Sequence, residues 1–277
     1  MRALLRGPRI GLLVGVAVLA ASCGGGGGGA APGSATGGRD LWDDIQQRKV
    51  LRVAMTLQFP PQFYRDPVTR EPAGYDVELL RLMAKDLGVE LQIDDMDFTG
   101  QVPALIAGRA DLIANGLVNT PERAKTLMFT EPYVPYELVL MIQKGKGITS
   151  VEALNQPGRV ISVLLGSVSH ELAKQLLPRA ELRGLERQDA CMLEVTSKNS
   201  DACMLEKFQA IPFVRNNSQT AEILVTPAPL ATQYGCFAIL PGNPKLLYWV
   251  NNWLKYYRAN GVLDATYNRI IGPSLAL

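Results

Sequence analysis

The chain has 277 residues, which is enough for one large domain or two of moderate size. Its 28 basic and 26 acidic residues give a formal charge of +2, an excess far too small for a nucleic-acid-binding surface. A single histidine excludes a multi-histidine metal site, and the four cysteines lack the spacing of a zinc site, so we expect no metal ion and no cofactor.

The first 23 residues have the pattern of an export signal. Arg2, Arg6 and Arg9 precede an apolar run of about a dozen residues, which suits a secretory signal better than a membrane span. The run ends in Leu-Ala-Ala-Ser before Cys23, a sequence that resembles a bacterial lipobox. We therefore interpret residues 1–23 as a lipoprotein signal peptide and Cys23 as the lipidation site. The alternative is an ordinary signal peptide with an incidental cysteine.

Residues 24–38, GGGGGGAAPGSATGG, predict a flexible tether between this signal and a folded part. The glycines do not form a phosphate-binding loop, because no strand precedes them and no Lys-Ser/Thr pair follows. Removal of the signal also removes three arginines and no acidic residue, so the basic excess belongs to the export signal and not to the folded protein.

From residue 50 onward, the apolar patterns of strands and helices alternate. We predict strands at 50–55, 89–93, 111–114, 137–142, 160–164, 202–205 and 237–240. We predict helices behind Asp76 as N-cap, at 102–106, through Leu172 and Leu176 up to Pro178, at 189–197 and at 244–257. This alternation is typical of parallel α/β sheets. The pattern restarts after residues 144–147, which predicts two α/β lobes.

Two further features concern the second half of the chain. The hexapeptide DACMLE occurs at 189–194 and again at 201–206, and we expect the first copy on a helix and the second on a strand. Cys191, Cys203 and Cys236 remain besides Cys23. Buried free thiols are the simplest interpretation, and the alternative is a contact between Cys203 and Cys236, both on predicted strands.

Several motifs occur together in a specific order. They are Phe59-Pro-Pro61, Gly74-Tyr-Asp-Val-Glu-Leu79, Met96-Asp-Phe-Thr-Gly100, Thr120-Pro-Glu-Arg123 and Phe129-Thr-Glu-Pro-Tyr133. In this order and spacing the chain resembles the bacterial extracellular solute-binding proteins of family 3, the amino-acid receptors of ABC importers. The resemblance covers about residues 45–272.

The resemblance implies an α/β fold of the two-lobed, type II periplasmic-binding-protein kind. Two crossing hinge strands join the lobes in that fold, and the ligand lies in the cleft between them. It implies a first lobe of residues 39–141 plus 239–277 and a second lobe of 142–238, with hinges near Gln143 and Phe237. It also implies a monomer.

The resemblance also implies ligand-binding residues in the first lobe. Arg123 stands at the position that grips the α-carboxylate of an amino acid, for which a planar guanidinium is well suited. The alternative is a solvated arginine at a helix start. Phe59 and Phe98 stand where aromatic rings enclose the ligand side chain, and the alternative for both is the core. The remaining expected contacts come from the loop with Gly116, Val118 and Thr120.

In the second lobe, the resemblance places Ser167 and Val168 at a helix start that closes on the carboxylate. Glu206 stands at the position of the acid that pairs with the ligand ammonium, where an aspartate is usual, and the alternative is a surface glutamate. Thr56 replaces an acidic residue that some relatives use for cationic ligands, which disfavours Arg or Lys as ligand.

The implied function is capture of a free polar amino acid by hinge closure, followed by delivery to the permease subunits of an ABC importer. The chain is then an exported lipoprotein, anchored in the cell membrane on its extracytoplasmic side, with no catalytic residue. Two alternatives stay open. One is an enzyme resembling cyclohexadienyl dehydratases, with Glu206 as its acid, and the other is a ligand-sensing or adhesion lipoprotein.

Overall fold

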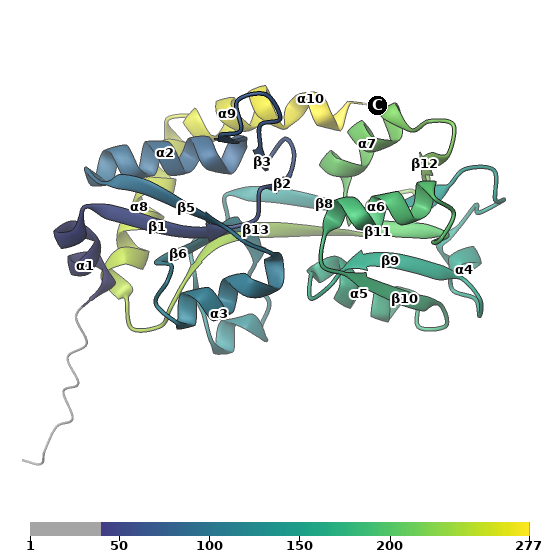
Figure 1. Cartoon of the computed structure of the whole chain (residues 1–277), viewed down its shortest axis with the longest axis horizontal. Helices are drawn as coiled ribbons and strands as arrows, with labels where there is room; N and C mark the ends of the chain where they lie inside the picture. The colour runs from purple at the N-terminus through teal and green to yellow at the C-terminus, as the bar shows by residue number, and fades with distance from the viewer. Residues whose placement is uncertain (1–39, 277) are drawn as a thin grey trace, which may run out of the picture. The chain divides into compact units, whose positions relative to one another are not determined.

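The computed structural model describes residues 40–276 (Figure 1). The predicted signal peptide, the tether and the lipidation site Cys23 lie outside the described residues. Of the helices in the described part, none is both long enough and apolar enough to cross a membrane.

The main sheet within residues 40–276 has ten strands, and eight of them follow the order β10-β9-β11-β8-β13-β6-β1-β5, while β12 pairs with β8 and β7 with β13. Its strands are β1 (Val50–Met55), β5 (Glu90–Asp95), β6 (Leu112–Val118), β7 (Met128–Phe129), β8 (Val134–Gln143), β9 (Val160–Leu164), β10 (Glu181–Leu185), β11 (Ala202–Glu206), β12 (Ala221–Ile223) and β13 (Ala231–Ile239). A small sheet contains β2 (Gln58–Phe59), β3 (Phe63–Arg65) and β4 (Pro72–Ala73).

Helices cover the sheet on both sides and connect most of the parallel strands. They are α1 (Leu41–Arg48), α2 (Tyr75–Leu87), α3 (Gln101–Ile106), α4 (Val151–Leu154), α5 (Val168–Leu176), α6 (Gln188–Thr196), α7 (Lys207–Asn216), α8 (Pro244–Ala259), α9 (Val262–Ile270) and α10 (Gly272–Leu275). Two 3-10 turns, η1 (Phe98–Gly100) and η2 (Arg123–Lys125), follow β5 and β6. The predicted α/β fold is therefore confirmed.

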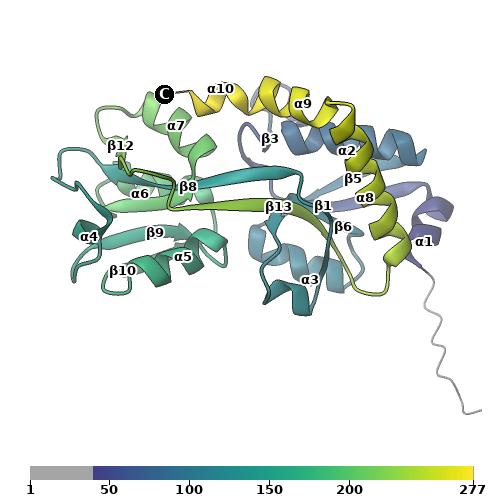
Figure 2. The ribbon, with the colours of Figure 1, turned by 180° about the vertical axis from the view of Figure 1, so that it is seen from behind.

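The two lobes have separate parallel strand sets. In the first lobe β1 pairs in parallel with β5 and β6, and in the second lobe β9 pairs in parallel with β10 and β11. Each lobe has its own buried apolar clusters, around Tyr75, Leu80 and Trp253 in the first and around Leu140, Val163 and Met204 in the second. Figure 2 shows β8 and β13 running from one strand set to the other.

The two long strands β8 and β13 change partners along their length, because each belongs to both lobes. Residues 134–138 of β8 pair with β13, and residues 138–142 pair with β11. On β13, Ala231 to Gly235 pair with β8, and Gly235 onward pairs with β6. The changes of partner thus fall at residues 138 and 235, and the predicted lobe boundaries at 141/142 and 238/239 stay a prediction.

Asp76 does not have the role that the sequence suggested. The N-cap of α2 is Gly74, and Asp76 lies in the first turn with its side chain fully buried. The carboxylate accepts hydrogen bonds from the side chains of Gln62 and Tyr133, 3.0 and 2.6 Å long. The Asp76 side chain therefore belongs to a buried polar network and not to a helix cap, since a buried carboxyl requires hydrogen-bond partners.

The repeated hexapeptide adopts two structures, as predicted. Its first copy belongs to α6, and the second contains the whole of β11, between β9 and β8. The three described cysteines are free and buried. The suggested contact between Cys203 and Cys236 is wrong, because β8 separates their strands and Cys203 lies opposite Met141, whereas Cys236 lies opposite Leu117.

Candidate functional site

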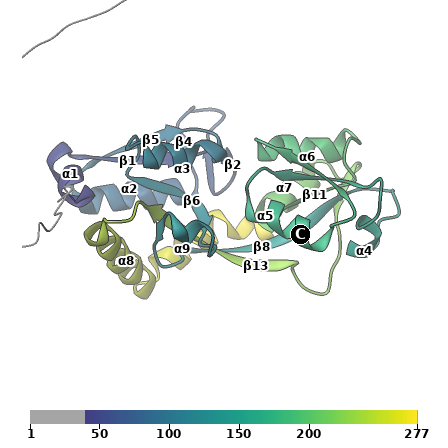
Figure 3. The ribbon, with the colours of Figure 1, turned by 90° about the horizontal axis from the view of Figure 1, so that it is seen from below.

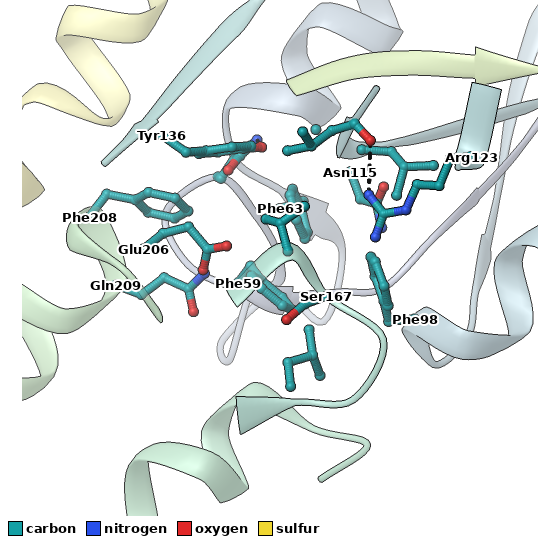
Figure 4. A pocket seen from close by; sticks show the side chains of 16 residues that line it. Phe59, Phe63, Phe98, Asn115, Arg123, Tyr136, Ser167, Glu206, Phe208 and Gln209 are labelled. Atoms are coloured by element: carbon teal, nitrogen blue, oxygen red, sulfur yellow. Dashed lines mark hydrogen bonds between the residues drawn. The ribbon is translucent and has the colours of Figure 1, made fainter. Parts of the chain in front are cut away.

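A cavity lies between the two lobes (Figure 4). The first lobe contributes strand ends and loops near β2 and β6, and the second lobe contributes the starts of α5 and α7. The lining residues are Phe59, Gln62, Phe63, Phe98, Asn115, Gly116, Leu117, Val118, Arg123, Tyr136, Leu164, Ser167, Val168, Glu206, Phe208 and Gln209.

Arg123 is held on the cavity wall by backbone acceptors from both lobes. It begins the turn η2, where its N–H donates to the Thr120 hydroxyl at 3.3 Å. Its guanidinium donates to the carbonyl of Val118 at 2.9 Å and, across the cleft, to the carbonyl of Gly166 at 3.0 Å. Burial lowers the pKa of Arg123, yet guanidinium groups remain charged in proteins. A fixed cation therefore faces the cavity.

Aromatic rings form the apolar part of the wall. The guanidinium carbon of Arg123 lies 5.8 Å from the centroid of the Phe98 ring, and the rings of Phe59 and Phe63 are 4.9 Å apart. Phe59 also belongs to the first-lobe core. The two interpretations of Phe59, core residue and cavity wall, are thus compatible.

Gly116 on β6 permits a close approach that no other residue allows. A Cβ added at Gly116 would lie 1.4 Å from the Tyr136 hydroxyl oxygen, and the backbone φ there is +60°. The Gly116 N–H donates to the Tyr133 hydroxyl at 2.9 Å. The Tyr136 hydroxyl accepts from Gln62 at 2.7 Å. Gln62 and Tyr133 both bond Asp76, so this part of the wall is built on one buried network.

Burial dominates the charge state of Asp76 beneath that network. It raises the pKa of the carboxyl to about 7, although the Tyr133 and Gln62 hydrogen bonds act in the opposite direction. Asp76 does not line the cavity. The carboxyl therefore supports the wall through Gln62 and Tyr133 and does not face the cavity space.

The second-lobe wall comes from two strand-to-helix turns. Ser167 is the N-cap of α5, and its hydroxyl oxygen accepts from the His170 N–H at 3.1 Å. Glu206 ends β11 and precedes α7, and its carboxylate accepts from the Gln209 amide at 3.2 Å. Burial raises the pKa of Glu206 to about 7. This carboxyl and the Arg123 guanidinium are the acidic and the basic side chain among the lining residues described within 40–276.

The structure brings eight of the nine expected ligand contacts to one cavity: Phe59, Phe98, Gly116, Val118, Arg123, Ser167, Val168 and Glu206. Thr120 is not among the lining residues, and its hydroxyl instead bonds the backbone of Arg123. Thr56 is buried and likewise does not line the cavity. That these residues contact a ligand stays a prediction.

Eight lining residues were not anticipated: Gln62, Phe63, Asn115, Leu117, Tyr136, Leu164, Phe208 and Gln209. Phe208 and Gln209 lie in the first turn of α7, which begins at Lys207 after Glu206, so a helix start predicted there would have indicated them. Tyr136 had no local signal, because it reaches the site only through the pairing of β8 with β13.

Three of the lining residues carry a buried amide oxygen that has no hydrogen-bond partner among the described residues. They are Gln62, Asn115 and Gln209. Buried polar atoms in folded proteins are nearly always paired, so we expect a water or an occupant that donates hydrogen bonds beside these oxygens. Within the described part of the chain, no group of three His, Cys, Asp or Glu side chains is placed to hold a metal ion.

Comparison with known proteins gives a consistent result for most of the chain. The model of the bacterial extracellular solute-binding proteins, family 3, matches residues 51–273. An arginine-binding extracellular protein of Bacillus subtilis is 28% identical over 78% of this chain and 84% of its own length. An L-cystine-binding protein of Escherichia coli is 24% identical over 85% of this chain and 87% of its own length.

Solved structures agree with the sequence comparisons. An ancestral amino-acid-binding protein, a precursor of cyclohexadienyl dehydratase, superposes with a TM-score of 0.76 at 31% identity, over 83% of this chain and 99% of that one. A putative binding component of an ABC transporter from Wolinella succinogenes, complexed with lysine, gives a TM-score of 0.74 at 28% identity, over 81% and 96%. These neighbours are two-lobed binding proteins, which confirms the predicted fold class.

Proposed function

Because the chain belongs to family 3 of the bacterial extracellular solute-binding proteins, we propose that it captures a free amino acid in the cavity and delivers it to the permease subunits of an ABC importer. One observation carries the proposal. Arg123 from the first lobe and Glu206 from the second line the same cavity, so a cation and a carboxyl face one space. A free amino acid carries the complementary pair, a carboxylate and an ammonium.

In the proposed complex, the ligand carboxylate accepts hydrogen bonds from the guanidinium of Arg123. This group already donates to Val118 and Gly166, and a carboxylate is a stronger acceptor than a carbonyl. The backbone N–H groups at the start of α5, beside Ser167 and Val168, favour an anion at the same place. The ligand ammonium pairs with Glu206, and Phe59 and Phe98 enclose the side chain.

Closure of the lobes follows from this division of contacts. In an open state, the ligand contacts only Arg123 and Phe59 of the first lobe. On closure it gains the contacts with Glu206 and Ser167 of the second lobe. A shift from mostly open to mostly closed requires about 5 kcal/mol of differential affinity. An amino acid that bridges both lobes through two charged groups supplies interactions of that order.

The polarity of the ligand side chain is inferred from the lining residues that we do not assign to its carboxylate or its ammonium. The amide oxygens of Gln62, Asn115 and Gln209 favour donors on the ligand, which supports a polar amino acid. The named relatives are an arginine-binding and an L-cystine-binding protein, and both of these amino acids are polar. Export and lipid anchoring through Cys23 complete the proposal, and they rest on the lipobox-like sequence alone.

A thermal-shift screen of the twenty amino acids tests the proposal directly. A ligand that binds only the folded state raises stability by about 2.7 kcal/mol at a hundredfold excess over Kd. We expect one or a few polar amino acids to raise Tm, and the corresponding amino alcohol, which lacks the carboxylate, to have no effect. Equal shifts with acid and alcohol would contradict the role of Arg123, and no shift with any amino acid would contradict the proposed ligand class.

A dehydratase is a second candidate, because Glu206 is a buried carboxyl with a raised pKa in the cavity. Such a group is partly protonated near neutral pH and can serve as a general acid. The named relatives are binding proteins, and the dehydratase precursor among the solved structures is itself an amino-acid-binding protein. Incubation with a cyclohexadienyl acid and product analysis separates the two functions, since a pure receptor forms no product.

A further inference from the structure

The exposed side of α8 carries a stripe of aromatic and basic side chains far from the cavity. Tyr248 is 73% exposed and Tyr256 is 62% exposed. Residues three and four apart share one face of a helix, which places six residues of α8 together. We call these the α8 face: Lys245, Tyr248, Trp249, Asn252, Lys255 and Tyr256.

The first helix of the described chain extends this face. The rings of Trp42 on α1 and Trp249 on α8 are 5.8 Å apart, and the Lys245 ammonium lies 5.3 Å from the Trp42 ring centroid. The Leu41 N–H donates to the Asn243 side chain just before α8, at 2.9 Å. Figure 3 shows α1 and α8 together at the end of the first lobe that is remote from the second lobe.

The position of α1 decides what the α8 face can reach. The chain enters the described part at Asp40, directly beside this face. Sixteen residues, 24–39, separate it from Cys23. A segment of that length spans at most about 55 Å in any conformation. A lipid on Cys23 would therefore keep the α8 face in the neighbourhood of the bilayer surface.

We propose that the α8 face, with Trp42, docks on the interfacial region of the bilayer in which Cys23 is anchored. The inference rests on the lipid anchoring in the proposed function. Tyrosine and tryptophan favour the membrane–water interface, because each has an apolar ring and a polar atom. Lys255 adds attraction to anionic headgroups, whereas the Lys245 ammonium pairs with Asp43 of α1, 3.1 Å away. All of these residues belong to the first lobe, so docking is independent of lobe closure.

The tryptophans make the contact measurable. The chain has three, Trp42, Trp249 and Trp253, and all lie in α1 and α8, so tryptophan fluorescence reports on this end of the molecule. A chain that begins at Cys23 retains the whole compact unit 39–277. Because the other three cysteines are buried, Cys23 can be coupled selectively to a maleimide lipid in phosphatidylcholine/phosphatidylglycerol vesicles, with or without brominated acyl chains.

We expect brominated lipid to quench the tryptophan fluorescence of the coupled protein. The double variant Tyr248→Ser/Tyr256→Ser should retain roughly half of this quenching or less. Tyr234→Ser removes a tyrosine that is 54% exposed on β13, away from α8, and should behave as the unsubstituted chain. Thermal melting of each variant checks that the fold is kept, which is expected because the substituted side chains are exposed.

Absence of quenching in the coupled, unsubstituted chain, or equal quenching in the double variant, would overturn the docking. Quenching that appears only at high protein density, together with cross-linked pairs, would show that a second copy occupies the face and would also overturn it. Amino-acid binding measured on the same vesicles is a separate readout, so a failure of docking is distinguishable from a failure of the receptor function. Mass analysis of Cys23 in cells tests the anchor itself, and an unlipidated Cys23 would overturn both the anchor and the docking.

Discussion

The two walls of the cavity are built in different ways. On the first-lobe wall, Gly116 and Tyr136 are fixed by a buried network that includes Gln62, Tyr133 and Asp76. On the second-lobe wall, Ser167 and Glu206 lie at strand-to-helix turns. The first wall is therefore a preformed platform, whereas the second consists of end groups that, in the proposed function, meet this platform on lobe closure.

Because the two walls differ in this way, substitutions in them should have different effects on ligand affinity and on stability. Arg123 is the exception, because it belongs to the platform and yet bonds Gly166 of the opposite wall. Substitutions in the platform should lower affinity and stability together. Substitutions at the turns should lower affinity with smaller effects on folding. The predictions below test this separation, beginning with the largest effect.

Arg123→Ala should have the largest effect on ligand affinity. It removes the cation that we assign to the ligand carboxylate and leaves that carboxylate desolvated without a partner. Truncation of one member of such a pair costs about 2–5 kcal/mol, or roughly 30-fold to several thousandfold in Kd. Calorimetric titration with the amino acid found in the screen measures the change.

The matched control for Arg123 is Lys125→Ala. Lys125 lies in the same turn and pairs with the exposed Glu122, 2.5 Å away, outside the cavity. Affinity should be unchanged in this variant, whereas Arg123→Lys should be intermediate, because lysine keeps the charge and loses the planar donor pair. An Arg123→Ala protein that binds within threefold of the unsubstituted chain would remove Arg123 from the site.

Gly116→Ala tests whether the platform is as rigid as its network suggests. The added Cβ would collide with the Tyr136 hydroxyl, and alanine is strained at a φ of +60°. We expect a loss of about 2–4 kcal/mol in the free energy of unfolding, together with weaker ligand binding. Denaturant unfolding, followed in parallel with titration, measures both.

Gly108→Ala isolates the backbone contribution to that result. Gly108 has a φ of +68°, but no atom lies within 4 Å of an added Cβ. This variant should cost only about 1 kcal/mol and leave ligand affinity intact. If the two variants lose the same stability, Tyr136 yields easily, and the platform is not rigid.

The regular elements of this fold were predictable, and the short ones were not. β1 and β9 were predicted with the correct bounds, since each is a compact apolar run. β10, with the sequence Glu-Leu-Arg-Gly-Leu, has no such pattern, and it is a strand because it pairs with β9 at the sheet edge. β6 extends past its predicted end, since Asn115-Gly116 resembles a turn but continues in the sheet.

The two copies of DACMLE show why local sequence is not sufficient. All six residues of the first copy are helical, whereas the last five residues of the second copy form the strand β11. The second copy lies between β9 and β8, and the pairing there decides its structure. The general case is that tertiary contacts override intrinsic propensity.

The site was predictable to the extent that its residues belong to motifs. Arg123 and Glu206 are far apart in sequence and were placed together only through the family resemblance. Gln62 and Tyr136 carry no motif, and their place in the wall depends on a hydrogen bond across 74 positions. The platform is therefore the part of the site that sequence analysis described least.

The charge of Glu206 should make ligand affinity depend on pH. Burial raises its pKa to about 7, so the free protein binds a proton there as the pH falls below 7. Pairing with the ligand ammonium requires the ionised form, so binding must release this proton. Affinity should be constant above pH 7 and should fall by up to about tenfold per pH unit below it.

Stability of the ligand-free protein should change in the opposite direction. The folded pKa of Glu206 lies above its ordinary value of 4.5, so the folded state takes up a proton first and gains stability as the pH falls from about 7. Asp76, whose pKa is also raised to about 7, acts in the same sense on stability. Since Asp76 does not line the cavity, affinity rather than Tm is the informative quantity.

Glu206→Gln provides the control for this pH dependence. The variant should bind weakly at pH 8 and show a flat affinity profile between pH 8 and 5.5. Glu222→Gln, on β12 and outside the cavity lining, should keep the profile of the unsubstituted chain. A slope that persists in Glu206→Gln would assign the proton to another group and weaken the proposed ammonium contact.

Ser167→Ala should have the smallest effect, and it separates the capping role of this residue from its place in the cavity wall. Its hydroxyl oxygen caps α5, and loss of an N-cap costs about 1 kcal/mol in the free energy of unfolding. Ser150 caps α4 in the same way, away from the cavity, by accepting from the Ala153 N–H. Ser150→Ala should therefore cost a similar stability but leave affinity unchanged, whereas Ser167→Ala should also weaken ligand binding a few-fold. Equal affinities in the two variants would mean that Ser167 only caps its helix, and that the second-lobe wall closes through the Glu206 turn alone.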